Sequence, residues 1–272
     1  MEMDQIRPEY VIFTDWCALM TSDGTTTHVL AGNSTLQGYR EGIGGEARFD
    51  KITGFAQISE KRVVLADYHN DCLRLIHRTS HSTSVFSGRC QSGGYREGRP
   101  GRFKNPWSTL LDKKDKKQLL VADNKNGAVR TVDVMSQAVG TFVKSASLTY
   151  IRPMTQDEKS GDLYVNAYHA IYRIKYTQRT VSLISGGVGP KYGYRDSMLL
   201  DSLFSWPYDL TLINPSTLLV ADDDRFRLVD MNSDKVTTLN VSNSLYSADS
   251  LLLTNDTLLV GQRKKIIKYE CE

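Results

Sequence analysis

The chain has 272 residues, of which 40% are hydrophobic and 24% charged, and its formal net charge at pH 7 is +3. This length suits one all-β domain with a real core, and the small charge gives no case for a concentrated nucleic-acid-binding face. No run of 18 apolar residues predicts a membrane span. The opening MEMDQIRPEY lacks the basic and apolar regions of a signal peptide.

A five-residue pattern recurs six times along the chain. Each copy is an apolar run, and four of the copies end in aspartate. Successive copies are 40 to 56 residues apart, which is the size of a four-stranded propeller blade. In chain order the copies are Val11–Asp15, Val63–Asp67, Leu119–Asp123, Leu163–Ala167, Leu218–Asp222 and Leu258–Gln262.

Each copy has the same surroundings. An apolar strand and a short turn precede it, as in Trp107–Leu111 followed by DKKDKKQ. An alternating strand follows it, and then a strand that ends in glycine, as in HVLAG, SVFSG and SLISG. Period-two alternation with turn residues between short runs predicts antiparallel strands. Four strands in each of six units account for nearly the whole chain.

The two ends of the chain are incomplete as blades. The first unit lacks a clear first strand, and the last unit ends after IIKYECE, where a fourth strand is expected. Because a propeller closes its first blade against its last, which removes exposed sheet edges, we expect contact between the termini. The sequence predicts an all-β, six-bladed β-propeller with four antiparallel strands per blade. It is predicted as one domain, 1–272, in which residues 1–9 match the pattern poorly.

A tyrosine-arginine-acid motif recurs in the loops that join the units. It reads GYREG at Gly38–Gly42 and Gly94–Gly98, and GYRDS at Gly193–Ser197. A fixed length with fixed chemistry predicts a fixed joint between blades. In that joint the acid accepts backbone amides or pairs with arginine, and the tyrosine packs between blades. Each motif begins six residues after a glycine that ends the preceding strand, counted from Gly32, Gly88 and Gly187.

The order of these features resembles the NHL-repeat β-propeller family. That order is a strand ending in glycine, the GYREG loop, ARF or GRF, an apolar strand, L-x-VAD, a polar loop and another strand. The resemblance covers residues 11–270 and is weaker over 140–180 and in the last unit. It implies that first strands line a central channel and that loops on one face carry a ligand site. GYREG and the residues after VAD belong to that face.

The candidate binding surface consists of these loop residues. Tyrosine and arginine are the residue types enriched at binding hot spots, and the basic, aromatic loop Arg96–Lys104 could stack on RNA bases. The basic turn Asp112–Lys117 belongs to the opposite face. The candidate binding residues are Tyr39, Arg40, Tyr68, His69, Tyr95, Arg96, Trp107, Tyr168, His169, Tyr194 and Arg195.

Metal and catalytic sites are the weaker hypotheses. A zinc centre needs three protein ligands, and only His69 and His169 occupy matching positions. No G-x-S-x-G elbow is present. We therefore expect no catalytic residue, no metal and no cofactor. Four aspartates that end second strands could form a calcium-binding ring, but we favour a loop-capping role for Asp15, Asp67, Asp123 and Asp222.

The four cysteines form two candidate disulfides. Cys72 begins a third strand and Cys90 follows the fourth strand of the same unit, so the turn near Thr79–His81 brings them together. Cys17 and Cys271 would pair if the termini meet. The alternative is four buried free thiols in a cytosolic protein.

The sequence favours a non-catalytic recognition module, secreted or the ectodomain of a larger protein, that binds a protein or glycan through its loop face. Three N-x-S/T sequons are candidate glycosylation sites: Asn33, Asn240 and Asn255. One alternative is an intracellular domain that binds RNA or protein. Another is a metal-dependent lyase or hydrolase of the amidating-lyase or lactonase propeller type.

Overall fold

The computed structural model describes residues 1–5, 7, 9–188, 191–239, 248–254, 257–262 and 265–270. The chain divides into two compact units, Met1–Thr149 and Tyr150–Glu272. Each unit holds three consecutive antiparallel sheets, which we call blades and number 1 to 6 in chain order. The described elements are strands and short 3-10 helices, as the sequence predicts for an all-β chain. None of the described helices has the length and hydrophobicity that crossing a bilayer requires.

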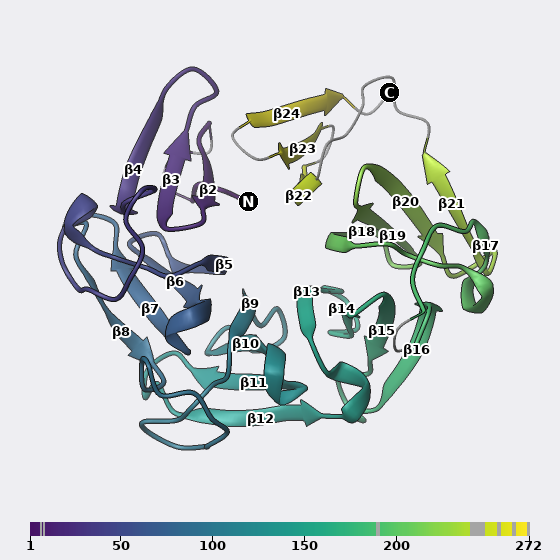
Figure 1. The fold of residues 1–272 in the computed structure, drawn as a ribbon, viewed down its shortest axis with the longest axis horizontal. Helices are drawn as coiled ribbons and strands as arrows, with labels where there is room; N and C mark the ends of the chain where they lie inside the picture. The colour runs from purple at the N-terminus through teal and green to yellow at the C-terminus, as the bar shows by residue number, and fades with distance from the viewer. Residues whose placement is uncertain are drawn as a thin grey trace. The chain divides into compact units, whose positions relative to one another are not determined.

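The first unit contains blades 1 to 3. In each blade the four strands follow one another in chain order across the sheet, as Figure 1 shows for β5 to β8 and β9 to β12. Blade 1 consists of β1 (Glu2–Met3), β2 (Val11–Asp15), β3 (Ala18–Ser22) and β4 (Thr27–Gly32). Blade 2 consists of β5 (Ile52–Ser59), β6 (Arg62–Asp67), β7 (Cys72–His77) and β8 (Thr83–Ser87). Blade 3 consists of β9 (Pro106–Leu111), β10 (Gln118–Asp123), β11 (Ala128–Asp133) and β12 (Val139–Lys144).

The second unit contains blades 4 to 6. Blade 4 consists of β13 (Ile151–Gln156), β14 (Leu163–Ala167), β15 (Ala170–Ile174) and β16 (Val181–Gly186). Blade 5 consists of β18 (Pro207–Asn214), β19 (Thr217–Asp222), β20 (Arg225–Asp230) and β21 (Lys235–Leu239), and it gains a fifth strand, β17 (Ser197–Met198), on β21. In its described part, blade 6 has three strands: β22 (Ala248–Leu253), β23 (Thr257–Gln262) and β24 (Lys265–Glu270).

The first strand of blade 1, which the sequence does not show clearly, is the two-residue strand β1. Glu2 and Met3 pair antiparallel with β2. Gln57 of β5 fixes them, because its side-chain amide donates to the Met3 carbonyl (2.6 Å) and to the Glu2 carboxylate (3.0 Å). Residues that match the repeat poorly therefore still supply a strand, which a neighbouring blade holds in place.

The core of each unit lies between successive blades. In β6, Val63 and Leu65 belong to the apolar cluster shared with blade 1, whereas Val64 and Ala66 belong to the cluster shared with blade 3. Strand β19 divides its residues between two clusters in the same way. Because both faces of these second strands are buried, they form continuous apolar runs instead of alternating with polar residues.

Glycine is required at the ends of these fourth strands because a backbone carbonyl lies too close for a side chain. At Gly32 (φ +98°) a Cβ would lie 2.2 Å from the Cys17 carbonyl oxygen, and at Gly186 (φ +94°) 2.4 Å from that of His169. The glycine equivalent to Gly32 and Gly88 in blade 4 is therefore Gly186 and not Gly187. The predicted six-residue spacing is wrong for the third motif, whose loop is one residue longer.

The predicted disulfide between Cys72 and Cys90 is present, with the two Cα atoms 4.9 Å apart. It joins the start of β7 to the loop that follows β8. Cys17 is a buried free cysteine, and its predicted partner Cys271 lies outside the described residues, so that pairing stays a prediction.

Candidate recognition surface

Each tyrosine of the three loop motifs lies over a buried arginine from the third strand of the following blade. The arginines are fully buried, and cation–π attraction is strongest where water is excluded. The guanidinium lies 4.8 Å from the ring centre for Arg74 and Tyr39, 4.2 Å for Arg130 and Tyr95, and 4.9 Å for Arg227 and Tyr194.

Blade 3 shows how such an arginine is held. Arg130 donates from Nη1 to Asp123 Oδ2 (3.0 Å) and to the Arg102 carbonyl (3.2 Å). From Nη2 it donates to the carbonyl of Arg96, a residue of the motif (3.1 Å), and from Nε to the carbonyl of Gly140 (3.0 Å). The backbone of the motif therefore binds the guanidinium, so the loop and the third strand are fixed to each other.

The acid that ends the second strand is the counter-ion of this arginine. The carboxylate-to-guanidinium distances are 3.1 Å for Asp67 and Arg74 and 3.0 Å for Asp222 and Arg227, with all four side chains fully buried. Burial raises the pKa of Asp67 to about 6, against the opposing effects of the Asp50 amide, Asn70 and Arg74. Burial likewise raises the pKa of Asp123 to about 6.

The predicted loop-capping role is wrong for Asp67, Asp123 and Asp222, because the backbone amides that they bind lie just before first strands and not in the loop that follows the second strand. Their oxygens are nevertheless occupied. Asp67 Oδ1 accepts from the Asp50 amide (2.8 Å) and from Asn70 Nδ2 (2.9 Å), while Oδ2 accepts from Arg74. A ring of metal-binding carboxylates would need those same oxygens. Within the described part of the chain, no group of three or more His, Cys, Asp or Glu side chains could hold a metal ion.

The acid of each motif binds the fourth strand of the following blade. Glu41 Oε1 accepts from the Val85 amide of β8 (3.1 Å), and Glu97 Oε1 accepts from Thr141 Oγ1 of β12 (2.6 Å). Asp196 accepts from the Thr238 amide (2.9 Å) and from Arg227. The motif therefore connects the third and fourth strands of the blade that it precedes.

Motif tyrosine, second-strand acid and third-strand arginine occur together in blades 2, 3 and 5. In blade 4, Ala167 stands at the position of the acid and Tyr172 at that of the arginine, and no motif precedes the blade. In blade 1, Met20 stands at the arginine position and Asp15 remains, half-buried. Loss of the loop thus accompanies loss of the buried pair.

The motif arginines are placed differently from the tyrosines. Arg40, Arg96 and Arg195 are exposed, and no side-chain hydrogen bond or ion pair of theirs occurs among the described residues. Their backbones form isolated bridges within the loop. These three arginine side chains are therefore available to a partner.

A first aromatic cluster, in the first unit, surrounds a lysine. Lys51 Nζ lies 5.3 Å from the ring centre of Trp16, 5.1 Å from that of Tyr68 and 4.9 Å from that of Trp107. The Tyr68 and Trp107 rings meet edge to face at 5.2 Å. The rings come from three blades, and Trp16 is 61% exposed. We call these four residues the Lys51 cluster.

A second aromatic cluster lies in the second unit around His169. Tyr150 packs on Tyr168 (4.8 Å between ring centres), and the His169 ring contacts Tyr192 (5.2 Å) and Trp206 (5.1 Å). The Arg152 guanidinium lies 5.6 Å from the Trp206 ring centre. His169 is buried, whereas the four other rings of this His169 cluster are more than a third exposed.

The two Tyr-His pairs place their histidines in different surroundings. His69 is half-exposed, and its Nδ1 lies 2.8 Å from Asp50 Oδ1. His169 is buried among aromatic rings; burial lowers its pKa, with Arg152 adding to the effect and a hydrogen bond with the Ser205 backbone opposing it. The two histidines therefore lie in different environments.

Some residues of both clusters are not identified from the sequence. Sequence analysis finds Tyr68, Trp107, Tyr168 and His169, which the structure brings into the clusters. It misses Trp16, Tyr192 and the three residues just before first strands: Lys51, Tyr150 and Trp206. Alignment of the repeats on the phenylalanine or leucine that precedes first strands would have placed the last three at one position.

The predicted glycosylation sites are only partly described. The Asn33 side-chain oxygen accepts hydrogen bonds from the Thr35 amide (3.0 Å) and hydroxyl (2.8 Å), within an exposed turn. Asn240 and Asn255 lie outside the described residues. Glycosylation stays a prediction at all three positions.

Solved structures match this chain, whereas no family model and no curated protein sequence does. A chain of the crystal structure of a nidogen/laminin complex is 11% identical, with a TM-score of 0.67 over 96% of this chain and 89% of that one. An auxiliary nutrient binding protein from Bacteroides ovatus is 11% identical (TM-score 0.72), and one from Bacteroides thetaiotaomicron 12% (0.71). Each of these two covers 99% of this chain and 68% of its own. These likenesses show the fold, a six-bladed β-propeller.

Proposed function

We propose that this chain is a non-catalytic recognition module that works outside the cell and binds a protein or glycan through the loop ends of its blades. The observation that carries the proposal is the gathering of exposed aromatic rings and cations in the Lys51 and His169 clusters. Apart from Tyr192, which lies in the loop between β16 and β17, the residues of both clusters follow second strands or lie near the start of first strands. The exposed motif arginines belong to the loops that lead to those first strands.

The chemistry of the clusters supports binding. Tryptophan, tyrosine and arginine dominate binding hot spots because they offer a large contact area together with a polar or charged group. The rings also hold one another: Tyr68 packs on Trp107, and Tyr150 on Tyr168. Prepositioned side chains lose less conformational entropy on binding. Loops on a rigid scaffold are the usual place for such sites.

The location is supported by the Cys72–Cys90 disulfide, because stable disulfides are typical of oxidising compartments. Two of the similar structures bear the name of nutrient binding proteins, and another belongs to a nidogen/laminin complex. Those names favour a binding role over catalysis.

The proposal is tested by binding to defined panels. Immobilised oligosaccharides form one panel, and purified secreted proteins, including laminin, form the other. We expect at least one member to bind, with the dissociation constant raised at least about tenfold (about 1.4 kcal/mol) by Trp16→Ala combined with Trp206→Ala. Met135→Ala is the control, because this exposed methionine lies beyond β11, at the other end of the strands. Equal binding by the double variant would contradict the proposal.

A further inference from the structure

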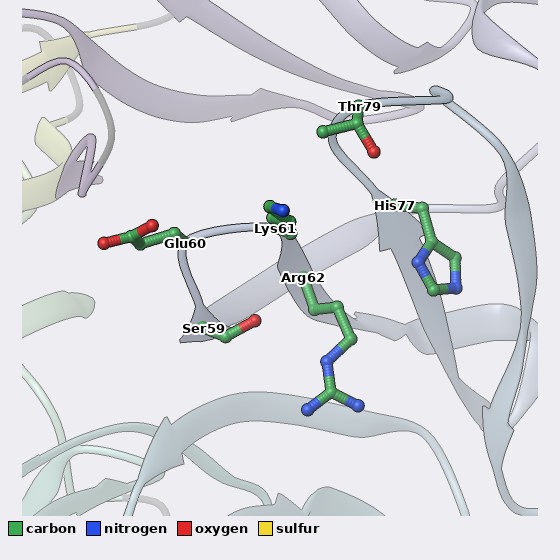
Figure 2. Close-up of a pocket in the computed structure, with 6 residues that line it drawn as sticks. All are labelled: Ser59, Glu60, Lys61, Arg62, His77 and Thr79. Carbon is green, nitrogen blue, oxygen red and sulfur yellow. The ribbon is translucent and has the colours of Figure 1, made fainter.

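A row of polar side chains crosses blade 2 at the end of the strands that lies away from Tyr68. Ser59 of β5 pairs with Arg62 of β6, and Arg62 pairs with His77 of β7. Directly paired residues project to the same face of a sheet. A hydroxyl, a guanidinium and an imidazole therefore stand side by side and line an open hollow of about 440 Å³ (Figure 2).

The basic side chains of this hollow have no ionic partner in the described part of the chain. Among the described residues, the side chains of Lys61, Arg62 and His77 make no hydrogen bond and no ion pair. Glu60 adjoins them in the turn, but its carboxylate points away from Arg62 and His77 in Figure 2. The three arginines that are buried among the described residues, in contrast, each have a carboxylate partner.

The neighbouring blade extends the positive charge. Ile58 and Leu111, near the ends of β5 and β9, pack against the same core cluster, so the two turns that follow lie at one edge of the unit. The turn after β9 is DKKDKK, in which Lys116 and Lys117 are exposed.

The acids of this neighbouring turn are engaged by backbone groups. Asp112 accepts from the Lys114 amide and Asp115 from the Lys117 amide. Asp133, whose pKa is lowered by bonds from Ser136 and by the charge of Lys117, accepts from the Met135 and Ser136 amides. These bonds leave the carboxylates charged, but the turn carries four lysines against these three acids, so its formal net charge is positive.

We propose that the Ser59–Arg62–His77 row, with Lys61, binds a sulfate group of a sulfated polysaccharide, and that the Lys116–Lys117 turn contacts a neighbouring sulfate on the same chain. A guanidinium and an imidazole offer N–H donors to an oxyanion, and a hydroxyl adds a further hydrogen bond. The choice of a polysaccharide over nucleic acid rests on the extracellular location in the proposed function. The site itself is separate from the aromatic clusters, because it lies at the opposite end of β6.

The test measures binding of the full chain to heparin, to chemically desulfated heparin and to poly(U) RNA at 150 mM salt. The test variant is Arg62→Gln/His77→Gln. Its matched control is Arg89→Gln/His28→Gln, which changes the same residue types at exposed positions outside the row. We expect the test variant to raise the dissociation constant for heparin at least about tenfold and the control to change it less than about twofold. Desulfated heparin should bind at least about tenfold more weakly than heparin.

Three results would overturn the inference: no heparin binding by the wild type, equal loss in both variants, or RNA binding as tight as heparin binding and equally sensitive to Arg62 and His77. Unfolding temperatures of the two variants, measured in parallel, report whether folding is intact. If Arg62→Gln/His77→Gln does not fold, the more exposed Lys61→Gln, compared with Lys125→Gln, replaces it with the same expected direction. Heparin binding is tested through Arg62 and His77 and panel binding through Trp16 and Trp206, so this site and the proposed recognition surface can fail separately.

Discussion

The Asp123 carboxylate lies 3.0 Å from the Arg130 guanidinium, and both side chains are fully buried. The ring of Tyr95 and the carbonyls of Arg96, Arg102 and Gly140 also contact that guanidinium. The repeated loop motif thus covers a buried ion pair and contacts its guanidinium. Its tyrosine and acid hold the blade together, whereas its arginine remains at the surface.

Arg130→Met should destabilise the chain by about 3 to 5 kcal/mol, because it leaves Asp123 buried without its counter-ion. Blade 4 provides the matched control, since Ala167 and Tyr172 stand there in place of the pair. Asp123→Ala/Arg130→Tyr should therefore lose less stability than Arg130→Met. Urea unfolding measures both. A double variant that is no more stable than the single one would show that the charge pair is not the cause.

Tyr95→Leu should cost about 1 to 2 kcal/mol of unfolding free energy, because it removes the aromatic face from a desolvated guanidinium. Tyr95→Phe keeps that face and loses only the hydrogen bond between the phenol and Thr141 (2.6 Å), so its cost should be about 1 kcal/mol or less. Thermal unfolding of the two variants compares them. An equal loss in both would contradict a cation–π contribution.

The pH dependence of stability should change when Asp123 is replaced. The folded-state pKa of Asp123, about 6, lies above its ordinary value of 3.8, so the folded chain holds this proton more tightly than the unfolded chain. Titration of Asp123 therefore lowers the free energy of unfolding as pH rises from about 4 to about 6, by up to about 3 kcal/mol. The stability difference between wild type and Asp123→Asn should fall over that interval and be constant above it. A constant difference throughout would contradict the raised pKa.

Arg40→Gln/Arg96→Gln should leave the free energy of unfolding within about 0.5 kcal/mol of wild type, because these exposed side chains make no described contacts. If they contact the partner, the same variant should bind it at least about tenfold more weakly. A large drop in thermal stability would instead assign these arginines a structural role.

The Cys72–Cys90 disulfide should be worth about 3 kcal/mol, because it closes a loop of 18 residues in the unfolded chain. Cys72→Ser/Cys90→Ser should show this loss in chemical denaturation. Peptide mapping without reduction should recover the two cysteines linked. Recovery of both as free thiols from natively secreted protein would contradict the pairing.

Much of the fold is visible in the sequence because second strands are buried on both faces. VVLAD and LLVAD are uninterrupted apolar runs, and their recurrence reveals the blades. The short strand β1 is not visible, because Glu2 and Met3 depend on Gln57 from another blade. The spacing of the third motif is mispredicted because two glycines, Gly186 and Gly187, are adjacent and only the backbone conformation distinguishes them.

The candidate site is less predictable than the fold. A tyrosine that stacks on Arg130 and one that lies in an exposed aromatic cluster are alike in sequence, and only packing separates them. Arg74, Arg130 and Arg227 occupy strand positions where burial of a charge is not expected. The one sequence feature that indicates their burial is an aspartate earlier in the chain. It lies seven residues before Arg74 and Arg130 and five residues before Arg227. Cross-strand neighbours such as Arg62 and His77 can be identified only when the register of the strands is known.

The measurement that tests the central claim most directly is hydroxyl-radical footprinting of the chain, with and without the partner bound in the panel experiment. Binding through the loop ends predicts protection of Trp16, Tyr192 and Trp206, which are all exposed in the chain alone. Met135, at the other end of the strands, should react equally in both samples. Protection of Met135 with unchanged labelling of the three aromatic residues would contradict the proposed recognition surface.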